Sequence, residues 1–203
     1  MKKMDQEQQE SLTRFTERYT NGQVPWDDVL PPPEVQQLVA SLPAGRALDL
    51  GCGYGRTAIY LAQQGWQVDA VDFVPQAIAE AKRRATEAKA IQQIQFHVGS
   101  VADLHFANGQ YDLAIDIGCM HSLSHELQTA YREELLRLLR PGAAYLLFAR
   151  LRNPDDDPAD GPSGMDEAAL KALFTPFQLQ KSEIGVTAGE DYSWQSGWFW
   201  YWR

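Results

Sequence analysis

The sequence predicts an α/β fold: a seven-stranded, mostly parallel sheet with helices on both faces and an antiparallel C-terminal strand. From residue 46 onward, short apolar strands alternate with helical segments, which is typical of parallel strands joined by right-handed crossovers. A glycine-rich turn directly follows the first of these strands. Near the C-terminus the alternation ends, and two strands follow each other across a short loop, as in a hairpin. The length of 203 residues suits a single domain over residues 1–203, with its core in residues 46–203.

The chain begins with two expected helices that precede the sheet. A polar helix is predicted over residues 5–19, because Leu12, Phe15 and Tyr19 recur at spacings of three and four. Asn21-Gly22 ends it. A second helix is predicted over residues 34–42, since Pro33 suits the first turn of a helix.

The alternating region supplies most of the sheet. Strands are expected over residues 46–50, 67–72, 93–98, 111–117 and 143–150. The helices between them are expected over residues 55–64, 75–89 and 125–140, the last stopped by Pro141-Gly142. After an acidic loop over residues 153–164, a helix over 166–174 precedes two strands at 177–186 and 192–202, joined by a loop that contains Gly189. The aromatic residues of the last strand should mostly pack in the core and at the sheet edge.

Charge and composition exclude several classes of partner. A net charge of −9 and a pI near 4.9 argue against nucleic acid, which requires clustered Lys and Arg. The run Lys82-Arg83-Arg84 is interpreted as a solvated helix face. The chain has no apolar run of 18 residues and no signal-peptide pattern, so we expect a cytoplasmic protein without a membrane partner. Two cysteines are too few for a disulfide framework. We also expect a monomer or a weak homodimer.

The glycine-rich turn carries the strongest functional signal. Asp49 precedes Gly51, Gly53 and Gly55, and the next strand ends in Asp72. Such glycines let a ligand approach the backbone, and a carboxylate at the end of the second strand accepts ribose hydroxyls. The spacing differs from the G-x-G-x-x-G of dinucleotide sites, which disfavours a nicotinamide-dependent oxidoreductase. An acidic residue before the turn would repel a pyrophosphate and suits a ligand with sulfonium and ammonium groups.

Residues 49–55 resemble the first motif, D/E-x-G-x-G-x-G, of the class I S-adenosylmethionine-dependent methyltransferases, which they match without a gap. The resemblance implies a Rossmann-like fold, S-adenosylmethionine as cofactor and S-adenosylhomocysteine as product. Asp49 would hold the ammonium group, Asp72 the ribose and Phe73 the adenine. Alternatively, Asp72 caps the following helix and Asp103 caps a turn. The implied cofactor contacts are Asp49, Gly51, Cys52, Gly53, Gly55, Asp72, Phe73, Ser100, Val101 and Asp103.

The end of the fourth strand is expected to lie over the transferable methyl group in this fold. Cys119 and Met120 would then line the acceptor site, and Asp116 is a strand-end carboxylate. His121 is the candidate general base, because its unperturbed pKa lies near neutrality. Alternatively, His121 only satisfies backbone groups in a turn. Cys52 and Cys119 are expected to approach each other, but no metal-ligand spacing supports a metal site there.

The flanking segments resemble the thiopurine S-methyltransferase and thiol/halide methyltransferase superfamily. The resemblance rests on short motifs: Asn21-Gly22, Val24-Pro25-Trp26-Asp27, Pro31-Pro32-Pro33, Gly161-Pro162 and Tyr192-Ser193-Trp194. It implies that residues 1–28 form a lid, mobile without ligand, whose Tyr19 and Trp26 contact the substrate. The chain departs from the thiopurine branch at Ile117 and Ser163, where an arginine and a second proline would be expected.

The two resemblances together favour a methyltransferase acting on a small molecule, with sulfur or another soft nucleophile as acceptor. One alternative is an N- or O-methyltransferase of a small natural product that uses His121 as base. A second alternative is a non-catalytic S-adenosylmethionine-binding protein.

Overall fold

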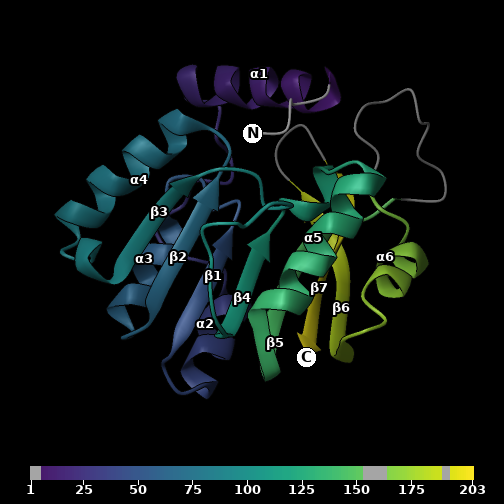
Figure 1. The fold of residues 1–203 in the computed structure, drawn as a ribbon. Helices are drawn as coiled ribbons and strands as arrows, with labels where there is room; N and C mark the ends of the chain where they lie inside the picture. Colours follow the sequence, from purple (N-terminus) through teal and green to yellow (C-terminus); the bar gives the residue numbers. More distant parts are fainter. Residues whose placement is uncertain (1–5, 153–163, 189–192) are drawn as a thin grey trace.

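In the computed structural model, the chain forms one seven-stranded sheet in the order β3-β2-β1-β4-β5-β7-β6 (Figure 1). The structure describes residues 6–152, 164–188 and 193–203. Strands β1 to β5 pair in parallel, whereas β7 runs antiparallel to both β5 and β6. The predicted mixed sheet is therefore confirmed. The strands are β1 Arg46–Leu50, β2 Gln67–Asp72, β3 Ile94–Val98, β4 Tyr111–Ile117, β5 Leu139–Arg150, β6 Gln178–Ala188 and β7 Ser193–Trp202.

Helices cover both faces of the sheet, as expected. Apolar residues of α5 and α6 join the core on one face, and those of α2, α3 and α4 join the core on the other. The final aromatic strand divides between these two cores, since Phe199 and Tyr201 face one and Trp200 faces the other. The helices are α1 Gln6–Thr20, α2 Pro33–Ser41, α3 Arg56–Gln63, α4 Pro75–Glu87, α5 His125–Leu138 and α6 Glu167–Leu173, with 3₁₀ turns η1 Ile91–Gln93 and η2 Met120–Ser122.

The boundary between α5 and β5 differs from the prediction. The helix ends at Leu138 rather than at residue 140, and β5 already begins at Leu139, which pairs with Tyr111 of β4. Pro141 and Gly142 therefore lie within the strand and do not stop the helix. Gly142 has a φ of 80° and its N–H donates to the Arg203 carbonyl at 2.6 Å. The neighbouring C-terminal strand thus keeps this irregular stretch in the sheet.

The N-terminal segment comprises residues 6–28. Its helix α1 lies across the end of the sheet toward which the parallel strands point (Figure 1). Tyr19 is buried there together with Val74 and Ala77, which lie where β2 leads into α4. Leu12 and Phe15 of the same helical face also pack in this cluster, as the periodicity predicted. Helix α1 is therefore placed over the end of the sheet that carries the glycine turn.

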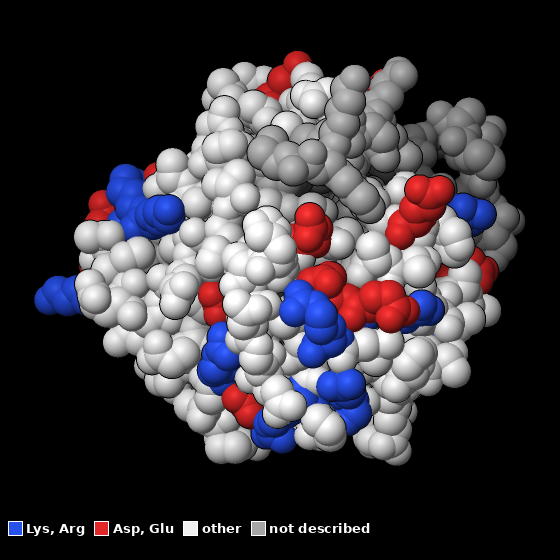
Figure 2. All heavy atoms as spheres, viewed as in Figure 1, with Lys and Arg blue, Asp and Glu red and all other residues white. Residues whose placement is uncertain are grey.

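Acidic and basic side chains alternate over the face of the molecule shown in Figure 2, where the described residues form no continuous basic patch. Across the three described ranges, the structure contains no helix with the length and apolar character needed to cross a bilayer. Four features of the sequence argument lie outside the described residues: Gly161-Pro162, Ser163, Gly189 and Tyr192.

Candidate functional site

The glycine turn between β1 and α3 has a backbone that only glycine adopts readily. Gly51, Gly53 and Gly55 have φ values of 72°, 53° and 81°. The turn is tied to the next strand, because the N–H groups of Gly51 and Cys52 both donate to the Val71 carbonyl at 2.9 Å. The turn therefore fixes a stretch of main chain beside the end of β2, and Gly53 and Gly55 are buried there.

Asp72 links the end of β2 to the glycine turn. One carboxylate oxygen accepts the Gly53 N–H and the other accepts the Val74 N–H, both at 2.9 Å. The side chain is buried, and burial raises its pKa above the usual value for aspartate despite these bonds. The N-cap of α4 is Val74, so the alternative reading of Asp72 as the helix cap is wrong, although its bond to the Val74 N–H supports the chain just before the helix. This bond is compatible with binding a ribose, since each carboxylate oxygen has a second lone pair.

Asp49 is buried one strand away. Its carboxylate accepts the Ala58 N–H from α3 at 2.9 Å. Burial raises its pKa to about 7, and the nearby Arg56 acts against that shift. Asp72 and Asp116 act on Asp49 in the opposite sense to Arg56. Three buried carboxylates therefore lie close enough at the ends of β1, β2 and β4 to influence one another.

Asp116 is the most deeply buried of the three. Its carboxylate accepts the N–H groups of Cys119 at 2.7 Å and Met120 at 3.0 Å, and the Tyr131 hydroxyl at 2.9 Å. The Tyr131 hydroxyl also lies 3.0 Å from that of Tyr145. Burial raises the pKa of Asp116 to about 7. These contacts place Asp116 beneath the loop after β4, where it holds the backbone of η2 in position.

His121 lies on that loop but does not pair with Asp116 in the described part of the chain. Its Nδ1 instead accepts the backbone N–H of Arg150 at 3.4 Å. Burial and the charge of Arg150 lower the pKa of His121 to about 4. The imidazole is therefore neutral at pH 7. Its one accepting nitrogen is the Nδ1 that takes the Arg150 N–H, so His121 is a weaker base than the sequence suggested.

The two cysteines approach each other closely enough to interact electrostatically, as expected, but they pack in different cores. Cys52 belongs to the core on the α2–α4 face, whereas Cys119 packs against the core on the α5–α6 face. Both are free thiols. A side chain on Gly51 would come within 2.9 Å of the Cys119 sulfur, so Cys119 lies directly against the glycine turn. Met120 is fully buried.

The residues after β3 differ in their surroundings. Val101 is buried in the core, and the Ser100 hydroxyl accepts the Ala102 N–H at 3.2 Å. The Asp103 side chain is 72% exposed and lies 3.6 Å from His105. Among these three residues, Ser100 and the backbone of Val101 are the better placed to contact a ligand at the end of the sheet.

Aromatic side chains of the N-terminal segment cover the expected cofactor position. A side chain on Gly53 would meet the Tyr19 hydroxyl at 3.0 Å and the Trp26 ring nitrogen at 4.0 Å. Phe15 packs edge-on against Phe73, with ring centres 5.6 Å apart. Burial and the charge of Asp72 raise the pKa of Tyr19, which keeps its hydroxyl protonated. The structure thus brings Tyr19, Trp26 and Phe73 together with the glycine turn.

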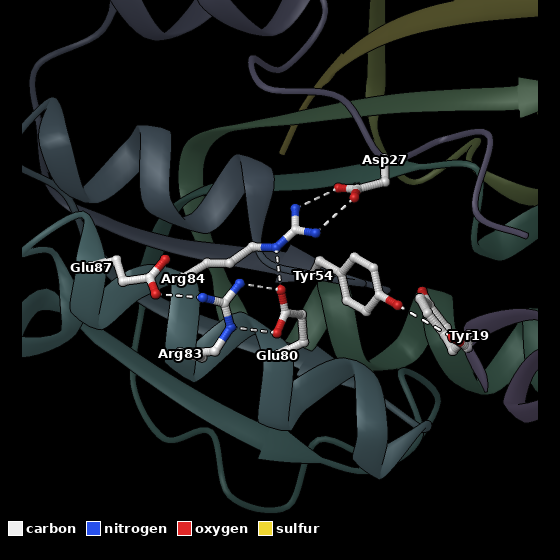
Figure 3. Close-up of polar contacts among 7 residues, drawn as sticks. All are labelled: Tyr19, Asp27, Tyr54, Glu80, Arg83, Arg84 and Glu87. Atoms are coloured by element: carbon white, nitrogen blue, oxygen red, sulfur yellow. Dashed lines mark hydrogen bonds and ion pairs between the residues drawn. The ribbon is translucent and has the colours of Figure 1, made fainter. Parts of the chain in front are cut away.

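A cluster of polar contacts beside this cover was not predicted (Figure 3). Arg84 was interpreted as part of a solvated helix face, but it forms a bidentate ion pair with Asp27 and stacks on the Tyr54 ring. Arg83, its neighbour, does match the prediction, since its side chain is 56% exposed. The only local signal was the spacing of Glu80 and Arg84, which favours an ion pair along one helix.

Comparisons with known proteins agree with this geometry. Residues 47–142 match a family model described as a methyltransferase domain. The chain is 32% identical over 156 residues to a 2-heptyl-1-hydroxyquinolin-4(1H)-one methyltransferase of Mycobacteroides abscessus, covering 75% of this chain and 67% of that protein. It is 34% identical over 115 residues to a ubiquinone biosynthesis O-methyltransferase of Xanthomonas oryzae pv. oryzae, covering 56% of this chain but only 46% of that protein.

A solved structure shares the fold over the full length. The 1,6-didemethyltoxoflavin-N1-methyltransferase of Burkholderia thailandensis, solved with S-adenosylhomocysteine, superposes with a TM-score of 0.75 at 20% identity, covering 100% of this chain and 92% of that chain. The glycine turn, the strand order and the antiparallel β7 agree with the matching family model and with the relative of 32% identity. The protein therefore belongs to the class I S-adenosylmethionine-dependent methyltransferases, with S-adenosylmethionine as its cofactor.

Proposed function

We propose that this protein methylates a small molecule whose acceptor atom, a sulfur or an acidic oxygen, ionises without help from a strong enzyme base. The observation that carries the proposal is the state of His121. Its Nδ1 already accepts the Arg150 N–H at 3.4 Å, and burial lowers its pKa to about 4. The Asp116 carboxylate is also enclosed, and it is bonded to the Tyr131 hydroxyl and to the N–H groups of Cys119 and Met120. A thiolate or another acidic nucleophile needs no such base.

The residues at the strand ends suit S-adenosylmethionine. The glycine turn places main chain without bulky side chains at the strand ends, and the carboxylates of Asp49 and Asp72 lie beside it. We assign Asp72 to the ribose, Asp49 to the ammonium group through its electrostatic field, and Phe73 and Ser100 to the adenine side. When bound, S-adenosylmethionine supplies a methyl group activated by a sulfonium. The field of the buried carboxylates favours such a cation over an anionic ligand.

The acceptor position follows from the loop after β4. A side chain on Gly118 would lie 3.4 Å from the His121 ring and 3.8 Å from the Phe148 ring, so this glycine separates the two. Phe148 and Trp198 also line a hollow of about 260 Å³, but its wall is mixed, because Glu34 and Glu183 lie in it as well. The protein's contribution to rate would be alignment and exclusion of water, since proximity alone is worth about 7–11 kcal/mol.

A second candidate is an N- or O-methyltransferase that uses His121 as general base. It is supported by the relatives, whose names include an O-methyltransferase and a hydroxyquinolone methyltransferase. In the neutral ring of His121, Nδ1 accepts the Arg150 N–H, so Nε2 carries the proton. His121 would therefore have to give up the bond to Arg150 before it could take a proton from an acceptor.

The discriminating experiment measures release of S-adenosylhomocysteine with a panel of acceptors. Aromatic thiols, phenols and N-hydroxy heterocycles of graded pKa form one series, and primary amines and aliphatic alcohols form the other. The proposal predicts turnover on the first series, with a pH profile that follows the pKa of each acceptor. Turnover restricted to amines or alcohols would refute it. A Gly53→Val variant, which should not bind cofactor, controls for background release.

A further inference from the structure

A bidentate ion pair joins the N-terminal segment to the body of the protein. Both terminal nitrogens of Arg84 on α4 donate to the two carboxylate oxygens of Asp27, each at 2.8 Å (Figure 3). The side chains are 31% and 19% exposed, so the pair is partly shielded from solvent. Paired hydrogen bonds between a guanidinium and a carboxylate fix orientation as well as distance.

Arg84 also contacts the glycine turn. Its guanidinium lies 4.5 Å from the centre of the Tyr54 ring, and Tyr54 stands between Gly53 and Gly55 in the turn. The Tyr54 hydroxyl in turn donates to the Tyr19 carbonyl at 3.5 Å. The third nitrogen of the guanidinium, Nε, donates to Glu80 at 2.8 Å, which holds the arginine against its own helix. One side chain therefore touches the N-terminal segment, α4 and the glycine turn.

The parts that Arg84 holds lie directly over the expected cofactor contacts. Trp26 precedes Asp27 in the chain, and its ring nitrogen and the Tyr19 hydroxyl both approach Gly53. The rings of Tyr19 and Tyr54 are 5.0 Å apart. Displacing Asp27 would therefore release the segment that covers the turn, without removing any group assigned to the cofactor itself.

We infer that Arg84 is a positioning residue for the cofactor site: through Asp27 and Tyr54 it holds the N-terminal segment over Gly53. S-Adenosylmethionine and S-adenosylhomocysteine then bind tightly only while this ion pair is formed. The inference rests on the proposed placement of the cofactor between Asp72 and the glycine turn.

Other charged groups face the pair and shape its strength. Arg56 interacts electrostatically with Asp27 and Asp28, and Arg83 competes for Glu80 at 2.7 Å. Because the pair is partly exposed, salt should weaken it. We therefore expect cofactor affinity to fall as NaCl is raised from low to high concentration, and this salt dependence should shrink in variants that lack the pair.

Calorimetric titration with S-adenosylhomocysteine tests the inference without any acceptor. Arg84→Ala and Asp27→Ala should each raise the Kd about tenfold, in line with the loss of a charged hydrogen-bonded pair. The double variant should bind no more weakly than either single variant, because all three lack the same contact. Arg83→Ala is the matched control: this neighbouring arginine pairs with Glu80 and Glu87 and makes no described contact with the N-terminal segment. It should bind as the wild type does.

Two further measurements separate positioning from general stability. Hydrogen exchange around residues 15–26 should be faster in the Arg84→Ala complex, while exchange in β1 and β4 stays unchanged. Arg84→Lys keeps the positive charge but loses the paired hydrogen bonds, so its affinity should lie between those of the wild type and Arg84→Ala. Equal weakening by Arg83→Ala, or wild-type affinity in Arg84→Ala, would overturn the inference. If Asp72→Ala also binds as the wild type does, the proposed cofactor position fails; if Asp72→Ala binds weakly while Arg84→Ala does not, only the positioning role fails.

Discussion

Replacing Asp72 with alanine should damage both the fold and cofactor binding, because one carboxylate supports both. It accepts the Gly53 and Val74 N–H groups at 2.9 Å in a buried setting, and alanine would leave both amides without that acceptor. Each hydrogen bond to a charged group is worth about 1.5–3 kcal/mol. Part of this loss is offset, since the buried charge and its desolvation cost disappear. We expect the free energy of unfolding to fall by about 2–4 kcal/mol.

Cofactor binding should also weaken, because Asp72→Ala lacks the proposed hydrogen bond to the ribose in addition to the bonds that hold the glycine turn. We expect affinity for S-adenosylhomocysteine to fall by about 1.5–3 kcal/mol, which corresponds to a Kd higher by roughly 10- to 150-fold. Asp72→Asn should lie between the wild type and Asp72→Ala. It keeps one acceptor oxygen but turns an amide N–H toward one of the two backbone donors.

Thermal unfolding measures the first effect and calorimetric titration the second. Asp103→Ala is the matched control, because Asp103 follows the neighbouring strand, is largely exposed and lies 3.6 Å from His105. Its stability should change by less than about 0.5 kcal/mol. The reasoning would be refuted by an Asp72→Ala protein with wild-type melting temperature and wild-type affinity. A destabilised protein with normal affinity would leave Asp72 as a structural residue of the turn alone.

The remaining predictions concern the turn, the loop and pH. Gly53→Ala should reduce S-adenosylhomocysteine binding below detection by calorimetry, because φ is 53° and the new methyl group would meet the Tyr19 hydroxyl at 3.0 Å; Gly22→Ala, which has open space, is its control. His121→Ala should lower turnover by less than about tenfold, whereas a loss of about 10²–10⁴-fold would identify His121 as a general base. The pKa of Asp49 is about 7 in the folded protein and about 3.9 in the unfolded chain. The folded state therefore holds this proton more tightly, and the free energy of unfolding should decline as the pH rises from about 4 to 7. Asp49→Asn should therefore flatten the decline in stability over that range, measured by urea unfolding at several pH values; an unchanged slope would contradict the buried, protonated carboxyl.

The strands and their succession along the chain were accessible from the sequence because their signals are local. Alternation of apolar strands with helices, and the glycines at 51, 53 and 55, depend on neighbouring residues. The boundary of α5 was wrong for the opposite reason. Pro141-Gly142 indicates a helix stop, but pairing of Leu139 with Tyr111 starts the strand earlier, and that contact joins distant parts of the chain.

The sequence indicated which residues gather at the strand ends, but not their chemistry. It placed His121 on the loop that follows Asp116, and the near-neutral pKa assumed for His121 was that of an exposed histidine. Its pKa falls only because the folded chain buries it beside Arg150. The Tyr131 bond to Asp116 and the Arg84 pair with Asp27 were equally inaccessible, since neither has a local spacing that indicates a tertiary contact.

The cluster of buried carboxylates has a consequence for how the enzyme distinguishes donor from product. Asp49 and Asp116 have pKa values of about 7, so each is partly protonated near neutral pH. Binding of a sulfonium cation favours their ionised forms and should expel protons into the buffer. The demethylated product carries no sulfonium charge and should expel fewer. Preference for donor over product should therefore grow with pH across neutrality, which makes product inhibition weakest under mildly alkaline conditions.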